Sequence, residues 1–313
     1  MVALAPMAGV TDASYRQLIK MLAPSAIVYS EFLSTDALHF GARKTMRMLH
    51  FDPALERPFI VQVFGKKPEH FLSAAKVVEE MGADGIDINM GCPAGKVVSS
   101  CHGSALMRDP ALAVELVRAV KEAVHIPVSV KTRLGWESSD ALLSFCSKLV
   151  EAGADALAIH GRTYKQKFSG EANWAPIYEL KKHVSVPVLG NGDIKTAADA
   201  VQKLQNLDGV MVGRGTFGNP WLLRDIVEAF AHASDGSALV PTIDRLTTHE
   251  KIPTMLQHAE LAVRVKGEER GMREMRRHFC SYIKGFAGAA ELRAKLVRVE
   301  TLAEAKEILN SIQ

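Results

Sequence analysis

The sequence predicts an α/β fold, a (β/α)8 TIM barrel followed by a small all-helical domain. Short apolar runs typical of buried strands recur through residues 1–215, and amphipathic segments typical of helices separate them. Eight such units in about 230 residues match the usual size of a (β/α)8 barrel. The pattern changes in residues 245–313, which show helical periodicity and no convincing strand. A barrel with a helical addition is therefore the expected architecture.

The eight expected strands are short and apolar. We predict them at residues 3–7, 27–30, 59–64, 85–89, 128–132, 156–160, 186–191 and 209–213. The clearest helical segments between them are residues 68–81, 110–124, 141–152 and 196–204. Strand–helix alternation favours parallel βα units. A doubly wound open sheet is the alternative, but it normally carries a glycine-rich phosphate turn after its first strand, and residues 5–9 (APMAG) are not such a turn.

The end of the chain is expected to form a separate helical unit. A helix should cover residues 219–231, and the polar stretch at 232–238 should be a linker. Beyond it, helices are expected at residues 253–266, 272–286 and 301–312. We therefore divide the chain into a barrel domain, residues 1–235, and a helical domain, residues 240–313.

Composition indicates a reduced, cytoplasmic protein. No apolar run approaches the roughly 18 residues of a membrane span, and the first residues lack the basic region of a signal peptide. The four cysteines include no CxxC pair, so we expect neither a disulfide framework nor a metal site. The net charge of +3 resides in residues 244–313, where 13 Lys and Arg accompany 10 Asp and Glu. This surplus indicates an acidic partner or a solvated helical surface.

Polar residues gather at the carboxyl ends of the expected strands, where barrels place their chemistry. Some of them admit a structural role, since Gln62 could cap a strand and His160 could be a buried core histidine. Chance placement at eight strand ends would nevertheless be a rare coincidence. In chain order the ends carry Pro6, Met7 and Ala8, then Glu31, Gln62, Asn89 with Cys92, Lys131 with Arg133, His160 with Arg162, Asn191-Gly192-Asp193, and Gly213-Arg214-Gly215.

Cys92 has the position of a catalytic group. The strand that ends near Asn89 runs into Gly91-Cys92-Pro93, where the chain must turn. A thiol at a strand mouth beside an amide can act in proton transfer or as a nucleophile. The alternative is a small buried hydrophobe, which is the usual role of a free cysteine.

Two glycine-containing loops predict a phosphate site. Residues 191–193 and 213–215 follow the seventh and eighth strands, and each precedes a helical segment. Loops in these positions commonly hold phosphate in barrels. Tight turns that need glycine are the alternative. The arginine between two glycines, Arg214, favours phosphate.

With these motifs in view, the chain resembles the tRNA-dihydrouridine synthases almost end to end, most closely the bacterial B-type subfamily. Each motif alone is shared with other flavin barrels, but the ordered set is specific. The chain departs from the family at Tyr164 and Phe168, where many relatives have Arg and Tyr, and at Cys101, an additional thiol. The matching motifs are residues 5–12 (APMAGVTD), 87–93 (DINMGCP), 103–106 (GSAL), 131–133 (KTR), 160–163 (HGRT), 191–193 (NGD), 213–215 (GRG) and 276–278 (RRH).

The resemblance implies FMN as cofactor, NADPH as reductant and a tRNA uridine, in the D-loop, as substrate. Uracil is electron-poor at C6, so hydride would add there and a proton would then reach C5. A thiol, with an ordinary pKa of about 8.5, is mostly protonated at neutral pH and can give that proton. Cys92 is thus implied as general acid, and Asn89 and Arg133 as substrate contacts. The implied cofactor residues are Pro6, Met7, Ala8, Gln62, Lys131, His160, Asn191, Gly192, Asp193, Gly213 and Arg214.

The helical domain is implied to bind tRNA. Arg270, Arg273 and Arg277 fall on one helical stripe that could contact phosphates, and surface ion pairs with neighbouring glutamates are the alternative. We expect a monomer. Two other functions remain open. A flavin dehydrogenase of a free pyrimidine would leave residues 245–313 without a role. A tRNA-binding protein with a vestigial barrel would leave the polar residues at the strand ends without a role.

Overall fold

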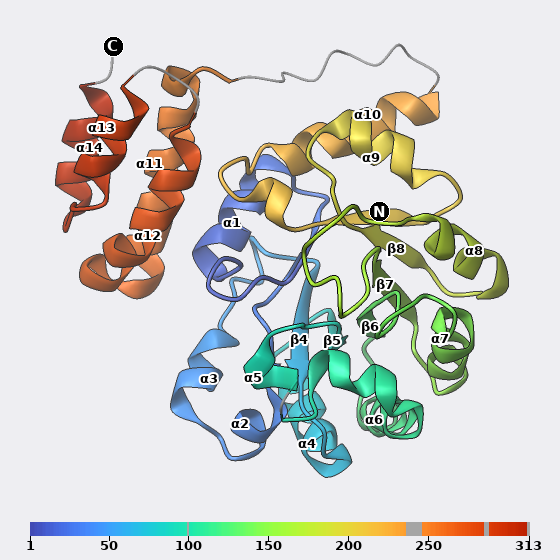
Figure 1. Cartoon of the computed structure of the whole chain (residues 1–313). Coiled ribbons are helices and arrows are strands. Elements are labelled where there is room, and N and C mark those ends of the chain that lie inside the picture. Colours follow the sequence, from blue (N-terminus) through green and yellow to red (C-terminus); the bar gives the residue numbers. More distant parts are fainter. Residues whose placement is uncertain (99, 236–245, 285–287, 312–313) are drawn as a thin grey trace.

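The structure is a computed structural model, and it describes the chain except for residues 99, 236–245, 285–287 and 312–313. Its centre is a closed parallel barrel, as predicted (Figure 1). Neighbouring strands pair in parallel, and closure is completed by the pairings of β1 with β9 and of β2 with β4. The barrel strands are β1 (Val2–Leu4), β2 (Ile27–Tyr29), β4 (Phe59–Phe64), β5 (Gly85–Met90), β6 (Val128–Arg133), β7 (Ala156–His160), β8 (Val188–Asn191) and β9 (Gly209–Val212).

One further strand lies at the rim of the barrel. β3 (Leu33–Ser34) pairs with the last residues of β4, since Leu33 is opposite Val63 and Ser34 is opposite Phe64. The sequence prediction missed it because two residues give no periodicity. It matters for function because β3 begins a rim segment that continues into α2 (Thr35–His39) and α3 (Arg43–Met48).

Helices cover the outside of the barrel (Figure 1). Sequence signals explain several of their ends: α6 begins with the cap residue Asp109 and a proline in its first turn, and α9 begins with a capping box of Thr196 and Asp199. A helical segment was expected after every strand, although bounds were given for only some of them, and α1 and α8 occupy two positions without stated bounds. The covering helices are α1 (Ala13–Leu22), α4 (Pro68–Glu80), α6 (Pro110–Ala123), α7 (Leu142–Glu151), α8 (Ala175–His183), α9 (Ala197–Leu204) and α10 (Leu222–Asp235), with the short α5 (Gly95–Val98), η1 (Gly103–Arg108) and η2 (Arg214–Thr216) at the strand ends.

Alternation along the strands places polar side chains inside the barrel. All six residues of β5 are buried, including the polar Asp87 and Asn89. Ile86, Ile88 and Met90 belong to the large core beneath the helices, so Asp87 and Asn89 point to the lumen. The register sets Asp87 beside Gln62 and Ser129, and Asn89 beside Lys131. The lumen therefore becomes polar toward the carboxyl ends of the strands.

The C-terminal region is helical in every part that the structure describes, as predicted. Its helices are α11 (Thr248–Lys266), α12 (Glu268–Tyr282), α13 (Ala289–Leu296) and α14 (Leu302–Asn310), and they share an apolar core of their own. The predicted bounds need correction. α11 begins five residues early because a capping box of Thr247 and Glu250 starts it before Pro253, α12 begins at Glu268, and α13 was missed.

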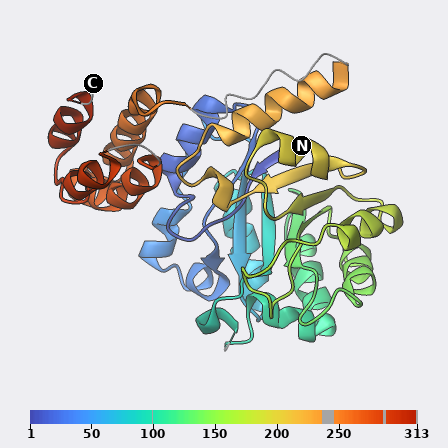
Figure 2. The same ribbon diagram turned by 45° about the horizontal axis from the view of Figure 1, so that its top comes forward.

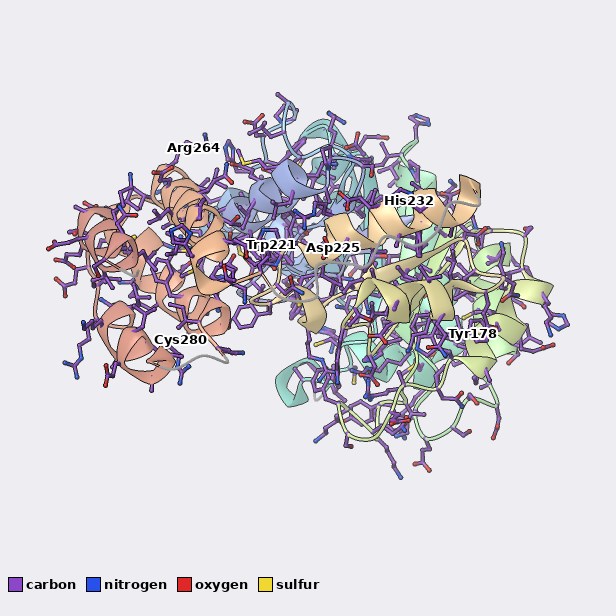
Figure 3. All side chains as sticks on the ribbon, turned by 90° about the horizontal axis from the view of Figure 1, so that it is seen from above. Tyr178, Trp221, Asp225, His232, Arg264 and Cys280 are labelled. Atoms are coloured by element: carbon purple, nitrogen blue, oxygen red, sulfur yellow. The ribbon has the colours of Figure 1, made fainter. Side chains whose placement is uncertain are left out.

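The predicted linker at residues 232–238 is partly wrong. α10 continues through Asp235, so the first four of these residues are helical, and the remaining three lie outside the described residues. Trp221, just before α10, packs into the C-terminal core, with its ring 6.1 Å from that of Tyr282. Figure 3 shows Trp221 between the barrel and the C-terminal helices. The two parts are thus joined by side-chain packing as well as by the chain.

The C-terminal helices lie against α1 (Figure 2). The ring of Tyr15 on α1 lies 5.4 Å from His258 and 5.6 Å from His278, centre to centre. Lys266 is held between Asp12 and Glu274, with 2.7 Å from its Nζ to Glu274 Oε2. α1 therefore connects the first βα loop of the barrel to the helical region.

A buried ion pair secures the other side of α1. Arg16 Nε donates to Glu56 Oε2 at 2.6 Å, and Glu56 Oε1 accepts from Gln17 and from the backbone N–H of Asp52. Glu56 is fully buried. This carboxylate thus ties the segment before β4 to α1.

We expect Glu56→Ala to lower the free energy of unfolding by about 3–5 kcal/mol, because it leaves Arg16 charged and unpaired in the core. Urea unfolding followed by circular dichroism measures this. The control is Lys182→Ala, which breaks an exposed pair with Glu179 and should cost about 1 kcal/mol or less. Equal losses in the two variants would contradict the structural role of Glu56.

None of the described helices combines the length and the apolar character needed to cross a membrane.

Candidate active site

A pocket of about 750 Å³ opens at the carboxyl ends of the barrel strands. It brings together every barrel residue that the sequence assigned to catalysis, cofactor or substrate, whereas Glu31, also expected at a strand end, is not part of the lining. Arg270, Arg273 and Arg277 are not part of its lining. The predicted residues in the lining are Pro6, Met7, Ala8, Gln62, Asn89, Cys92, Lys131, Arg133, His160, Asn191, Gly192, Asp193, Gly213 and Arg214.

The turn that carries Cys92 is built by Asn89. The side-chain oxygen of Asn89 accepts hydrogen bonds from the backbone N–H groups of Gly91 and Cys92, at 3.1 and 2.9 Å. Its Nδ2 donates to Gln62 Oε1 at 2.8 Å. The carbonyl of Cys92 accepts from the backbone N–H of Ser104. Both sides of the Cys92 peptide are thus fixed, and its partly buried thiol stays at the edge of the pocket.

Asn89 was predicted to contact substrate, and this geometry gives it a structural task as well. Its oxygen is already committed to the turn, so an N–H is what it can still offer to a ligand.

Lys131 lies deep in the pocket. Its Nζ donates to Asn191 Oδ1 at 3.2 Å, and Asn191 Nδ2 in turn donates to the Met211 carbonyl at 2.7 Å. Burial, reinforced by the charge of Arg133, lowers the pKa of Lys131 to about 8. An ammonium has three N–H donors, and one acceptor is described for this one. A ligand that supplies oxygen or nitrogen acceptors, or negative charge, would therefore be stabilised here.

His160 is neutral at physiological pH. Burial lowers its pKa to about 2, and the charges of Lys131, Arg133, Arg162 and Arg214 act in the same direction. Its Nε2 lies 3.4 Å from Nη1 of Arg162, which can only donate. Nδ1 therefore carries the ring proton, and the ring is a flat polar wall of the pocket.

Asp193 stabilises the loop that the sequence assigned to phosphate. Its Oδ2 accepts from Arg162 Nη2 at 2.7 Å and from the backbone N–H of Ala172 at 2.8 Å, and its Oδ1 lies 3.6 Å from Arg214. Asp193 adopts a positive φ of 50°, and the preceding Gly192 has φ 131°. A carboxylate repels phosphate, so we interpret Asp193 as the anchor of this loop. The backbone and Arg214 remain the groups suited to an anion.

Arg133 also serves the framework. Its Nε donates to the Gly91 carbonyl at 2.7 Å, and its Nη1 donates to the carbonyls of Thr163 and Lys167. It thereby links the Cys92 turn to the loop after β7. Its predicted contact with substrate must be made by the remaining Nη2 group.

Phe168 and Arg162 are site residues without an assigned role in the sequence prediction. The Phe168 ring is 54% exposed and lies 5.0 Å from the guanidinium of Arg214 and 5.5 Å from that of Arg133. Phe168 stood out in the sequence as a departure from related chains, which was the signal available. Arg162 was placed at a strand end and in the HGRT motif by the sequence, but its pairing with Asp193 is shown by no local pattern.

The arginines of the C-terminal stripe are largely paired with carboxylates. Arg270 pairs with Glu274 at 2.9 Å, and Arg273 pairs with Glu269 at 3.3 Å. Arg277 differs: a Cβ added at Gly9 would lie 2.7 Å from its Nη1, so its guanidinium rests against the first βα loop. The alternative of surface ion pairs therefore holds for two of the three residues, and Arg277 lies toward the mouth of the barrel.

A second cationic surface was not predicted. Arg43, Lys44 and Arg47 are exposed on α3, and in the part of the chain that the structure describes none has a carboxylate within ion-pair distance. α3 packs on α2 and on the rim strand β3. Its charge therefore lies beside the mouth of the pocket.

Among the described residues, no group of three or more His, Cys, Asp or Glu side chains could hold a metal ion. The fold and the pocket define a (β/α)8-barrel enzyme with a cationic, partly apolar site and a thiol at its edge. Comparisons with known proteins make this class specific. The family model described as dihydrouridine synthase matches residues 3–313. The chain belongs to the dihydrouridine synthase family, flavin-dependent oxidoreductases that convert uridine in tRNA to dihydrouridine.

Curated relatives with tRNA-dihydrouridine synthase names are similar to this chain over most of its length. A probable tRNA-dihydrouridine synthase 1 from Synechocystis sp. is 37% identical over 308 residues, which cover 97% of this chain and 84% of that protein. The tRNA-dihydrouridine synthase B of Pseudomonas aeruginosa is 38% identical over 304 residues, covering 95% and 88%. A 2-naphthoyl-CoA reductase structure aligns with a TM-score of 0.57 and 11% identity over 72% of this chain and 50% of that chain, which shows similarity of fold.

Proposed function

We propose that this protein reduces the C5=C6 bond of a specific D-loop uridine in tRNA to 5,6-dihydrouridine, with FMN as cofactor and NADPH as electron donor. One observation carries the proposal: a single pocket combines an anion-binding lining, an apolar wall and a thiol. Its lining holds the cations Lys131, Arg133, Arg162, Lys195 and Arg214 and one carboxylate, Asp193.

The donor set fits FMN. The phosphate would be held by the glycine loops after β8 and β9 together with Arg214. The wall formed by Pro6, Met7 and Ala8 is apolar and suits a flat ring, while Gln62, Lys131 and His160 supply polar contacts to its edges. When bound, FMN supplies the hydride that reaches C6 of the uracil.

The residues of the chain then complete the reduction. Addition at C6 leaves negative charge conjugated with the C4 carbonyl, so C5 becomes basic. The S–H bond of Cys92 breaks as the new C5–H bond forms, and the thiolate regains its proton from solvent. Asn89 and Arg133 hold the uracil near the thiol. Cys92 therefore acts as a general acid, and no bond forms between sulfur and substrate.

Assay of dihydrouridine tests the proposal. Purified protein should be yellow and should release FMN on denaturation. With NADPH it should form dihydrouridine in tRNA from a strain that lacks the modification, as measured by mass spectrometry of nucleosides. Turnover of dihydroorotate or orotate without tRNA would favour the free-pyrimidine alternative. A colourless protein that cannot be reconstituted with FMN would contradict both enzyme hypotheses.

We propose that residues 1–235 form the FMN-binding catalytic unit and residues 240–313 the tRNA-binding unit of a cytoplasmic monomer. A uridine must leave its stack to enter a barrel mouth, which costs a few kcal/mol. Contacts outside the pocket must offset this cost. The cations of α12 and α3 are candidates, because phosphate contacts position RNA without reading its sequence.

We expect Arg270→Glu, Arg273→Glu and Arg277→Glu in combination to weaken tRNA binding and to reduce its salt dependence. The log–log slope should fall by roughly one unit per lost phosphate contact at most. Arg270 and Arg273 already share their charge with glutamates, so the loss should be smaller than three full contacts. Filter binding at three salt concentrations measures it, with FMN content as control. An unchanged slope would show that the stripe is only an ion-paired surface.

We expect Arg43→Glu, Lys44→Glu and Arg47→Glu in combination to reduce the salt dependence of tRNA binding. The reduction should be at least as large as that caused by the triple substitution on α12. These side chains have no described carboxylate partner to neutralise them, so each can release a counterion on contact with phosphate. The same binding assay applies. Should tRNA affinity and slope match the unmodified protein, α3 lies outside the tRNA path.

A further inference from the structure

Asp87 is a fully buried carboxylate that the proposed reaction does not use. It lies on β5, two residues before Asn89, inside the barrel. Its Oδ1 accepts a hydrogen bond from Ser129 Oγ at 2.6 Å, and its Oδ2 accepts from Gln62 Nε2 at 2.6 Å. Asp87 is not part of the pocket lining, but Gln62 is.

These contacts form a continuous chain to Cys92. Gln62 Nε2 donates to Asp87, Asn89 Nδ2 donates to Gln62 Oε1 at 2.8 Å, and Asn89 Oδ1 accepts from the Cys92 N–H at 2.9 Å. An ionised carboxylate can only accept, whereas an amide can point either way. The chain is fixed at both ends. Ionised Asp87 requires the Gln62 amide to turn its nitrogen toward β5, and the backbone N–H groups of Gly91 and Cys92, which can only donate, require Asn89 to turn its oxygen toward them.

We infer that Asp87 is a positioning residue that fixes this hydrogen-bond chain from its buried end. Both amide oxygens are then occupied within the chain, and the group that Gln62 and Asn89 each have left for the pocket is their second N–H, not a carbonyl oxygen. The inference rests on the proposed function, because such donors suit the acceptor edges of a flavin ring and of uracil. It also explains why a carboxylate is kept in a place where burial is costly.

The surroundings of Asp87 predict that FMN affinity depends on pH. It is faced by Tyr29 from β2, by Gln62 from β4 and by Ser129 and Lys131 from β6. Burial raises the pKa of Asp87 to about 7, against the hydrogen bonds from Ser129 and Gln62 and the charge of Lys131. A protonated carboxyl can donate, which releases Gln62 to turn over. FMN affinity should therefore fall as the pH drops through about 7, and this dependence should be weaker in Asp87→Asn.

The test exchanges the side chains of Asp87 and Asn89, the two ends of the side-chain hydrogen-bond chain. Asp87→Asn removes the acceptor that sets the direction, and we expect about tenfold weaker FMN binding, the effect of one charge-assisted hydrogen bond. Asn89→Asp places a second acceptor against Gln62 Oε1 and should lower stability. The double exchange allows the chain to run in reverse, with position 87 donating to Gln62, Gln62 donating to position 89, and position 89 still accepting from the Cys92 N–H.

Two measurements distinguish the direction of the hydrogen bonds in the chain from the mere presence of those hydrogen bonds. Urea unfolding of the apoprotein should show that the double exchange recovers most of the stability lost in Asn89→Asp. FMN affinity should not recover, because the pocket then faces a carboxylate in place of an N–H. The matched control is Ser129→Ala, measured at a pH well above 7 so that Asp87 stays ionised without the hydrogen bond from Ser129. Under that condition it removes the other hydrogen bond to Asp87 and leaves the hydrogen-bond chain through Gln62 intact. It should keep the FMN affinity within about twofold, under 0.5 kcal/mol.

Repeating the exchange in a Gln62→Met background decides the cause. Recovery of stability should vanish there, because the middle of the chain is missing. If stability still recovers in the Gln62→Met background, the cause is simple repulsion between the two carboxylates, and the inference is overturned. It is also overturned if, with Gln62 present, the stability losses of the two single exchanges simply add in the double exchange. If Asn89→Asp does not fold, folded protein from the double exchange supports the inference and its absence opposes it. Failure of the unmodified protein to bind FMN would instead refute the proposed function, while the unfolding experiments on apoprotein still test Asp87.

Discussion

Cys92→Ala is expected to reduce dihydrouridine formation by about 10²–10⁴-fold, the usual contribution of a positioned general acid. Cys92 occupies the edge of the pocket on a turn fixed by Asn89, and its thiol is the acid of the proposed reaction. Its proton is needed only after hydride has reached C6. FMN content and NADPH oxidation should therefore remain close to those of the unmodified protein.

Single-turnover assays measure this effect directly. Enzyme reduced beforehand is mixed with tRNA, and dihydrouridine is followed against time at several pH values. Cys101→Ala is the control, because Cys101 is an exposed thiol in the following segment and should have a far smaller effect. Loss of FMN from Cys92→Ala would show a structural thiol and would refute its role as acid.

Lys131→Met is expected to slow flavin reduction by NADPH at least tenfold. This corresponds to an activation free energy higher by about 1.4 kcal/mol, because the charge that stabilises the reduced flavin is lost. It removes a cation of the pocket lining while keeping much of the side-chain volume. The charge also predicts a pH dependence. The pKa of Lys131 is lowered to about 8, so the ammonium is present below that pH and lost above it. Bound anionic ligand would raise this value, so the rate should decline at pH 8 or higher.

Stopped-flow absorbance at the flavin band gives the rate across pH. Lys131→Met should lack the alkaline decline that the unmodified protein shows. Lys148→Met removes a similar charge from the exposed face of α7 and serves as the control. An unchanged rate of flavin reduction in Lys131→Met would remove Lys131 from the cofactor chemistry.

The barrel and its pocket could be predicted because the fold turns sequence position into spatial position. Carboxyl ends of parallel strands meet at one edge, so Gln62, Lys131 and His160 had to come together once the strands were recognised. β1 and β8 are shorter than predicted, α13 was missed, and α1 and α8 were expected after their strands without stated bounds. These differences concern where elements begin and end. Those ends depend on local caps and contacts more than on periodicity.

Contacts between distant segments could not be predicted. The pairing of Arg162 with Asp193 and the position of Arg277 against Gly9 depend on how loops fold over the pocket. Asp87 was visible within a motif, yet its role depends on Gln62, 25 residues earlier, and on Ser129, 42 residues later. The charge of α3 was equally visible, and its importance became clear only when β3 placed it at the rim.

The packing of α1 against the C-terminal helices has a thermodynamic consequence. α1 follows directly on the loop that carries Pro6, Met7 and Ala8 into the pocket. Its residue Tyr15 packs against His258 and His278, and its cap residue Asp12 pairs with Lys266. The proposed cofactor wall and the helical region are thus connected through one helix. Any free energy by which bound tRNA changes the affinity for FMN must, by linkage, appear equally in the affinity of FMN-loaded protein for tRNA. Measuring the two affinities in both orders would give the strength of coupling through this helix.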